Sequence, residues 1–135
     1  MLNKVHHVTY VVENVDDMAA YIERNFSLTP IRRDEFTERG FKSILYQIGD
    51  TLVDFFEPLR DDTPMARQLQ ATGPGVMHVA WGVDGIGQLF NDLQANGNDM
   101  RGDGPSASPF GYLTASIEPA SSHGIYFQLA EGEHS

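Results

Sequence analysis

Two histidines occupy the same position in a repeated stretch of this sequence. His7 opens "HVTYVVENVDDMAAYIERNF", and His78, 71 residues later, opens "HVAWGVDGIGQLFNDLQANG"; the two stretches align without a gap. A lone histidine in an apolar strand usually has a structural role, but a second copy at the same place in a repeat indicates a shared one. Imidazoles bind metals and carry protons near neutral pH, so both kinds of chemistry are candidates.

Each half also carries one oxygen donor between apolar residues. Asp54 lies in "VDF" and Gln128 in "FQL", each in the segment that we expect to be the last strand of its half. The chain has no cysteine, so a bound metal must be held by nitrogen and oxygen atoms. If the halves are related by a pseudo-twofold axis, His7, His78, Asp54 and Gln128 converge near that axis as four potential ligands.

The elements that must position these residues follow from periodicity. Each copy begins with a strand and continues into an amphipathic helix of about three turns, whose apolar positions are Val15, Met18, Ala19 and Ile22 in one copy and Ile86, Leu89, Phe90 and Leu93 in the other. Asn14 is the expected N-cap of the first helix, and Asn96-Gly97 is the expected end of the second.

Further strand-like segments follow each helix. They are "TPIRRDEF", "FKSILYQI" and "TLVDFFEP" in the first half, and "DMRGDG", "FGYLTASIE" and "GIYFQLAE" in the second. Each half is therefore predicted to be a βαβββ module. We expect one α+β domain over residues 1–135, with module one at about 1–58, a linker helix at about 59–75 that begins near Thr63-Pro64, and module two at about 76–131.

Strand alternation assigns these residues to two faces. One face is apolar and must be covered by the helices; it holds Val8, Tyr10, Val12, Val53, Phe55, Val79, Trp81, Val83, Phe127 and Leu129. The other face mixes polar and small residues, with no lysine or arginine; it holds His7, Thr9, Asp54, His78, Ala80, Gly82, Tyr126 and Gln128. A solvated face is the alternative reading, but these residue types favour a lined cavity.

Composition narrows the function classes. Nine basic against nineteen acidic side chains give a net charge of −10, which opposes binding to nucleic acids or anionic membranes. No apolar run is long enough to cross a bilayer, and the start lacks the pattern of a secretory signal, so we expect a cytoplasmic protein. An anionic small substrate remains compatible, because the arginines form a potential positive rim: Arg32, Arg33, Arg60, Arg67 and Arg101.

The sequence resembles the vicinal oxygen chelate superfamily, which includes glyoxalases, bleomycin resistance proteins and dioxygenases. The similarity is greatest to its methylmalonyl-CoA epimerase and glyoxalase-like branch, and it is carried by "HHVTYVVENVDDMAAYI", "GDTLVDFFEPLRDDTPMARQLQ", "GVMHVAWGVDGI" and "SSHGIYFQL". The resemblance implies a curved, mostly antiparallel eight-stranded sheet with a central cup and helices on the outer face. It also implies a homodimer.

The same resemblance implies a function and a metal site. The family pattern takes one metal ligand from each of the first, fourth, fifth and eighth strands, and the matching positions are His7, Asp54, His78 and Gln128. The metal would be Zn, Ni, Co, Mn or Fe. The implied activity is that of a metal-dependent isomerase, epimerase or lyase on a small oxygenated carbonyl substrate, an acyl-CoA among the options, through a metal-stabilised enediolate.

The sequence departs from the family pattern at three of its functional positions. Gln128 stands where the family has glutamate, and Asp54 where it has Glu or Gln, so a bound divalent ion keeps a net site charge of about +1 and is held more weakly. Ser43 stands where the epimerases carry a proton-abstracting carboxylate on the third strand. The base is therefore unassigned; the substitutes are a metal-bound hydroxide, Glu57, Glu118, Tyr126 or His6. The expected substrate-binding residues are Thr9, Ser43, Phe56 and Tyr126.

Two alternatives stay open at this point. One is an Fe(II) ring-cleavage oxygenase with a two-histidine, one-carboxylate site, although the carboxylate comes here from the fourth strand and not the eighth. The other is a metal-free protein that binds or sequesters a small molecule, with a pocket lined by Phe41, Phe56, Phe110, Tyr112 and Tyr126.

Overall fold

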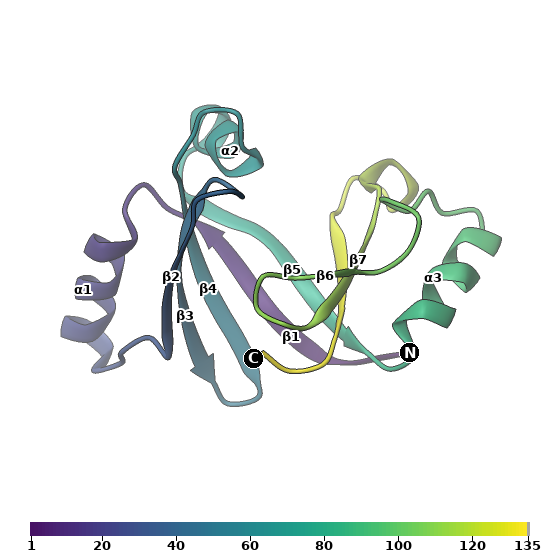
Figure 1. The fold of residues 1–135 in the computed structure, drawn as a ribbon, viewed down its shortest axis with the longest axis horizontal. Helices are drawn as coiled ribbons and strands as arrows, with labels where there is room; N and C mark the ends of the chain where they lie inside the picture. The colour runs from purple at the N-terminus through teal and green to yellow at the C-terminus, as the bar shows by residue number, and fades with distance from the viewer. Residues whose placement is uncertain (135) are drawn as a thin grey trace. The chain divides into compact units, whose positions relative to one another are not determined.

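The computed structural model describes residues 1–134, which form two βαβββ modules joined by a linker helix (Figure 1). The elements are β1 (Leu2–Val11), α1 (Val15–Phe26), β2 (Arg32–Phe36), β3 (Phe41–Ile48), β4 (Thr51–Pro58), α2 (Pro64–Thr72), β5 (Gly75–Val83), α3 (Ile86–Ala95), β6 (Ser106–Ala107), β7 (Leu113–Ile117), the short 3₁₀ helix η1 (Pro119–Ser121) and β8 (Phe127–Glu131). The predicted α+β class and module order are confirmed.

The chain clusters into two compact units whose boundary differs from the repeat boundary. Module one comprises His7–Met77, and module two comprises Met1–His6 together with the chain from His78 onward. Gly82 permits the close approach of the N-terminal segment in module two, because a Cβ there would lie 2.6 Å from Asn3 Oδ1 and 2.8 Å from Lys4 Cγ. The single domain spanning both modules stays a prediction.

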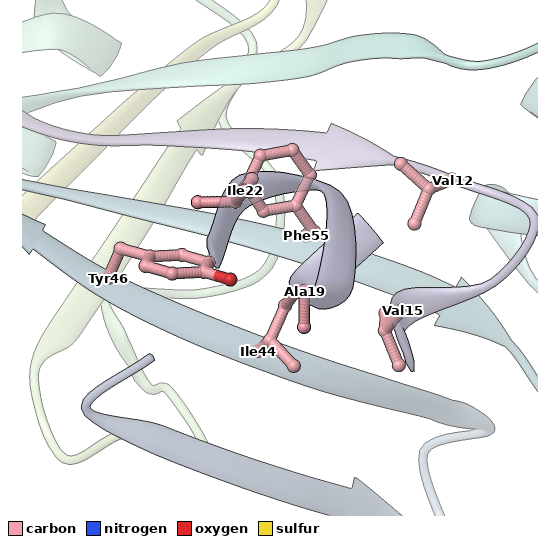
Figure 2. Packing of buried hydrophobic residues seen from close by; sticks show 7 residues of the cluster. All are labelled: Val12, Val15, Ala19, Ile22, Ile44, Tyr46 and Phe55. Carbon is pink, nitrogen blue, oxygen red and sulfur yellow. The ribbon is translucent and has the colours of Figure 1, made fainter. Parts of the chain in front are cut away.

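Module one orders its strands β2-β3-β4-β1. β2, β3 and β4 pair antiparallel, whereas β4 and β1 pair parallel. Helix α1 begins as predicted, since Asn14 Oδ1 accepts a hydrogen bond of 2.8 Å from the Asp17 amide. The apolar side of α1 packs on β1, β3 and β4 to form the core cluster of Val12, Val15, Ala19, Ile22, Ile44, Tyr46 and Phe55 (Figure 2). The helix-covered face of this module is therefore the one that alternation predicts.

The linker helix α2 is shorter than predicted but begins at the predicted cap. Thr63 Oγ1 accepts a hydrogen bond of 3.1 Å from the Ala66 amide, and Pro64 occupies the first helical position. Within module one, Met65 of α2 packs with Val11 and Phe41 in a second apolar cluster. This cluster lies on the face of β1 opposite to the one that α1 covers, because Val11 and Val12 alternate.

Module two repeats the arrangement with strand order β5-β8-β7-β6. β5 and β8 pair parallel, and β7 pairs antiparallel with both β8 and β6. Its core joins α3 to the sheet through Val83, Ile86, Phe90, Ala115 and Leu129. The mostly antiparallel pairing predicted for each module is therefore confirmed.

One predicted strand is wrong. The segment "DMRGDG" forms a single bridge, between Met100 and Ile117, and the strand at this place is instead the two-residue β6. Gly102 has φ of 76°, a left-handed conformation that turns the chain and cannot continue a ladder. The left-handed conformation of Gly102 therefore outweighs the alternation of its neighbours.

Candidate functional site

In module one, His7, Thr9 and Asp54 share the sheet face that α1 does not cover. Thr9 pairs with Asp54 across the parallel β1–β4 ladder, and His7 pairs with Leu52. Paired residues point to the same face, so the three side chains lie together. All three are buried, with Thr9 and Asp54 fully inaccessible to solvent. The predicted placement of these polar residues opposite the helix is correct.

Asp54 is the least satisfied of these groups. Neither of its carboxylate oxygens has a hydrogen-bond partner of good geometry, and the same holds for the Thr9 hydroxyl. Complete burial raises the pKa of Asp54 to about 7, while the proximity of the Thr9 hydroxyl acts in the opposite direction. An ionised carboxylate in such a place needs a cation, and without one it tends to take up a proton.

Module two carries the corresponding pair in the same register. Gln128 pairs with Ala80, two residues after His78, just as Asp54 pairs with Thr9, two residues after His7. Burial lowers the pKa of His78 to about 4, against an opposing hydrogen bond with Gln128 that raises it. His78 is therefore neutral near pH 7, which is the form of imidazole that binds metals.

A polar network surrounds His78 on its Tyr126 side. The rings of His78 and Tyr126 lie 5.2 Å apart between centroids, and the Tyr126 hydroxyl is 2.9 Å from Ser116 Oγ. The Arg101 guanidinium carbon lies 4.9 Å from the centroid of the Tyr126 ring, and Arg101 Nε donates to Glu118 Oε1 at 2.9 Å. Tyr126 is thus held in place beside His78, and its role in substrate binding stays a prediction.

The network contains two residues that sequence reasoning did not place at the site. Ser116 has no signal of its own in the sequence, and the sequence identifies Arg101 only as one of several arginines of a potential positive rim. Their proximity to Tyr126 depends on the pairing of β7 with β8 and on the loop that precedes β6. Both are long-range features that alternation along one strand does not contain.

The remaining predicted substrate-binding residues lie on the same face of module one. Ser43 pairs with Phe56 across β3 and β4, is 1% exposed, and its hydroxyl has no hydrogen-bond partner. Phe56 contacts Phe41, with ring centroids 4.4 Å apart, and packs against the cluster that includes Met65. Phe56 and Phe41 therefore act at least partly as core residues, whereas Ser43 is a buried polar group with no structural partner.

The side chains that are candidates for the missing base, Glu57, Glu118, Tyr126 and His6, all have structural partners. Glu57 Oε1 accepts a hydrogen bond of 2.9 Å from the Val15 amide and so caps the start of α1. Glu131 likewise accepts hydrogen bonds from the Gly85 and Ile86 amides at the start of α3 in module two. The Arg101 guanidinium holds the pKa of Glu118 below its usual range. His6 Nε2 lies 2.7 Å from the Gly132 carbonyl oxygen, and burial lowers the pKa of His6.

Whether a metal fits is answered best by the donor set itself. Among residues 1–134, no group of three or more His, Asp or Glu side chains is found in an arrangement ready to hold a metal ion. Each module nevertheless provides one buried imidazole and one oxygen donor in matching register, and the unpartnered carboxylate of Asp54 suits a cation. The chemistry of each donor is therefore suited to a divalent ion, and the set of His7, Asp54, His78 and Gln128 stays a prediction.

Comparison with known proteins agrees with the repeat and with the matching register of the paired residues. A model of the glyoxalase/bleomycin resistance protein/dioxygenase superfamily matches residues 6–112. The chain belongs to this superfamily. The uncharacterised protein YqjC of Bacillus subtilis (strain 168) is 22% identical to it over 130 residues, which is 96% of this chain and 93% of that protein.

Methylmalonyl-CoA epimerases of the superfamily are also similar to this chain. The mitochondrial enzyme of Homo sapiens is 27% identical over 94 residues, which is 69% of this chain and 53% of that protein. A Streptomyces coelicolor epimerase variant, solved in complex with 2-nitronate-propionyl-CoA, has a TM-score of 0.88 at 20% identity, covering 98% of this chain and 99% of that one. The structural match confirms the predicted fold. No helix in the described part of the chain has the length and apolar character of a membrane span.

Proposed function

We propose that this protein is a metal-dependent isomerase or epimerase that acts at the carbon next to a carbonyl group, with an acyl-CoA thioester as the favoured substrate class. The epimerases among its relatives support the reaction type. The complex of the Streptomyces coelicolor enzyme with 2-nitronate-propionyl-CoA supports the thioester. A lyase acting on a similar carbonyl compound uses the same intermediate and is distinguished by its products.

The observation that carries this proposal is the buried carboxylate of Asp54. It has no hydrogen-bond partner, it is fully inaccessible, and it lies on the same face as His7, as Gln128 does with His78. A divalent ion held by His7, Asp54, His78 and Gln128 would neutralise that carboxylate. When bound, the ion would supply Lewis-acid stabilisation of the enediolate that forms when the proton leaves.

The residues around these donors have defined contributions. The neutral state of His78 leaves a ring nitrogen able to act as a ligand, and Tyr126, fixed by Ser116, borders the site beside it. Burial, and to a smaller extent the charge of Arg101, lowers the pKa of His78. Arg101 also adds positive potential on that side, which favours an anionic substrate. Ser43 contributes an unpaired hydroxyl on the face of Asp54, suited to a hydrogen bond with a substrate oxygen.

The proposal is tested first by metal content. Protein purified without a histidine tag or chelator should contain close to one divalent ion per chain, or should take one up from nickel, cobalt, zinc or manganese. Asp54→Asn should lose this ion, whereas Asp50→Asn, in an exposed turn, should retain it. A ratio far below one that none of these metals improves would refute metal dependence and favour the metal-free binding protein.

Activity is tested separately in D₂O. Metal-loaded protein incubated with a panel of acyl-CoA thioesters, methylmalonyl-CoA included, should exchange the α-proton of one of them for deuterium, as followed by mass spectrometry. His78→Ala should abolish the exchange. Oxygen uptake with catechols after anaerobic iron loading, and no exchange with any thioester, would instead indicate the ring-cleavage oxygenase.

The homodimer remains part of the proposal. β2 and β6 are the edge strands of their modules, and an unpaired edge is a common place for a second copy to pair. Sedimentation equilibrium should give twice the mass of 15.0 kDa. A single species of monomer mass at micromolar concentration would refute the dimer without affecting the proposed chemistry.

A further inference from the structure

Thr9 lies directly beside Asp54 on the buried polar face of module one. The two residues pair across the parallel β1–β4 ladder, and neither is accessible to solvent. Adjacent strands lie about 4.8 Å apart, so the side chains of paired residues on one face are within reach of each other. Neither the hydroxyl nor the carboxylate completes a hydrogen bond in the structure. Two buried polar groups that each need a partner therefore lie side by side.

The repeat provides an internal comparison for this pair. The corresponding positions of module two hold Ala80 and Gln128, which pair in the same register. A carboxylate only accepts hydrogen bonds, whereas the amide of Gln128 has a donor of its own. The hydroxyl is thus present beside the candidate ligand that lacks a donor, and a methyl group takes its place beside the one that has a donor. Because module two forms the same strand pair with alanine, the fold does not require a hydroxyl at this place.

The Thr9 hydroxyl favours the charged form of Asp54. Burial raises the pKa of Asp54, and the Thr9 hydroxyl opposes this rise. An ionised carboxylate has two oxygens, so a cation bound to one oxygen leaves the other in a place without water. A buried acceptor without a donor is costly, and the hydrogen of the Thr9 hydroxyl is within reach to satisfy it.

We propose that Thr9 is a positioning residue, whose hydroxyl donates a hydrogen bond to one carboxylate oxygen of Asp54 and leaves the other oxygen for a divalent cation. This inference rests on the metal site of the proposed function. Groups that hydrogen-bond to a metal ligand fix its orientation, and their loss typically weakens metal binding about 10- to 100-fold.

Metal affinity tests the role of the hydroxyl. Thr9→Val removes the hydroxyl and keeps the shape of the side chain. Its affinity for Co²⁺, measured by competition with a chelating dye, should fall about 10- to 100-fold, and the visible absorption of the bound Co²⁺ should shift. Thr9→Ser retains the hydroxyl and should bind Co²⁺ nearly as well as wild type, and Thr37→Val, the same change in an exposed turn, should bind equally well. Wild-type affinity in Thr9→Val would overturn the inference and leave the proposed metal site intact.

A double-mutant cycle on metal-free protein tests the hydrogen bond separately from the metal. Urea unfolding at pH 8 with EDTA compares wild type, Thr9→Val, Asp54→Leu and the double variant. Thr9→Val should lower the folding equilibrium constant about tenfold more in the wild-type background than in the Asp54→Leu background, because only the former has the acceptor. Equal effects in both backgrounds would show a merely structural hydroxyl and overturn the inference. Absence of Co²⁺ uptake by wild type would refute the proposed metal dependence, and the hydrogen bond from Thr9 would then stand or fall with the cycle alone.

Discussion

Replacing Asp54 by asparagine should stabilise the metal-free protein at alkaline pH, although it removes a residue proposed to be functional. The pKa of Asp54 rises from 3.8 to about 7 on folding because the carboxylate is buried without a partner. The folded state therefore binds the proton more tightly than the unfolded state. The stability that comes from this tighter binding of the proton to Asp54 is fully present below about pH 4 and is lost as the pH rises through 7.

The size of the effect follows from the difference between the two pKa values. Each pKa unit corresponds to about 1.4 kcal/mol, so ionised Asp54 lowers the free energy of unfolding by up to about 4 kcal/mol above pH 7. Asparagine resembles the protonated acid in shape and carries no charge. We therefore expect Asp54→Asn and wild type to be similarly stable at pH 4, and the variant to be more stable by a few kcal/mol at pH 8.

The assay is urea unfolding with EDTA at several pH values between 4 and 8, with Asp50→Asn as the exposed control. Comparing variant with wild type at each pH cancels the titration of His78, which is common to both. Addition of a divalent metal should reverse the order at pH 8, because only the wild type gains the ionic partner. Unfolding free energies of wild type and Asp54→Asn that differ by the same amount at every pH would refute the reasoning, since they would show that Asp54 titrates normally.

Three further changes have directions set by the structure. The pKa of His78 falls to about 4 on folding, so the stability that neutral His78 contributes is present above pH 6.5 and is lost as the pH falls toward 4. Over that range the free energy of unfolding of wild type should fall by about 3 kcal/mol relative to His78→Gln, as measured by urea unfolding. Phe90→Ala should lower the free energy of unfolding by about 3–5 kcal/mol, the usual range for emptying a buried aromatic site, because Phe90 is 1% exposed in the core of module two. The midpoint of urea unfolding measures this loss, and a loss below about 1 kcal/mol would contradict the packing. Thr63→Ala should cost about 1 kcal/mol through loss of the cap on α2, and Thr63→Ser should restore most of it in thermal unfolding.

Local patterns predicted most of the elements correctly. The strands at 41–48 and 51–58 match the structure at both ends, and Asn14 and Thr63 cap their helices as expected. These features depend on neighbours within a few residues, so the sequence contains them directly. The predicted strand at 99–104 failed because the glycines in it favour a turn, a preference that alternation alone does not weigh.

Contacts between distant segments were not predictable in the same way. The first six residues cluster with module two, although the repeat alone suggests that they belong to module one. The sequence makes Glu57 a candidate base, whereas its carboxylate caps α1 in the structure. Each outcome depends on contacts between residues 42 or more positions apart, which a scan along the chain does not reveal.

The sequence alone therefore determined the repeat and the two sheet faces, because strand alternation with a period of two and the offset of 71 residues between His7 and His78 can be read directly from it. The tertiary structure decided which polar groups lose their water. Burial without a partner gives Asp54 its raised pKa and leaves the Tyr46 hydroxyl unsatisfied, and neither property is visible in residue type. Desolvation depends on what covers a side chain, and the covering residues come from other parts of the chain.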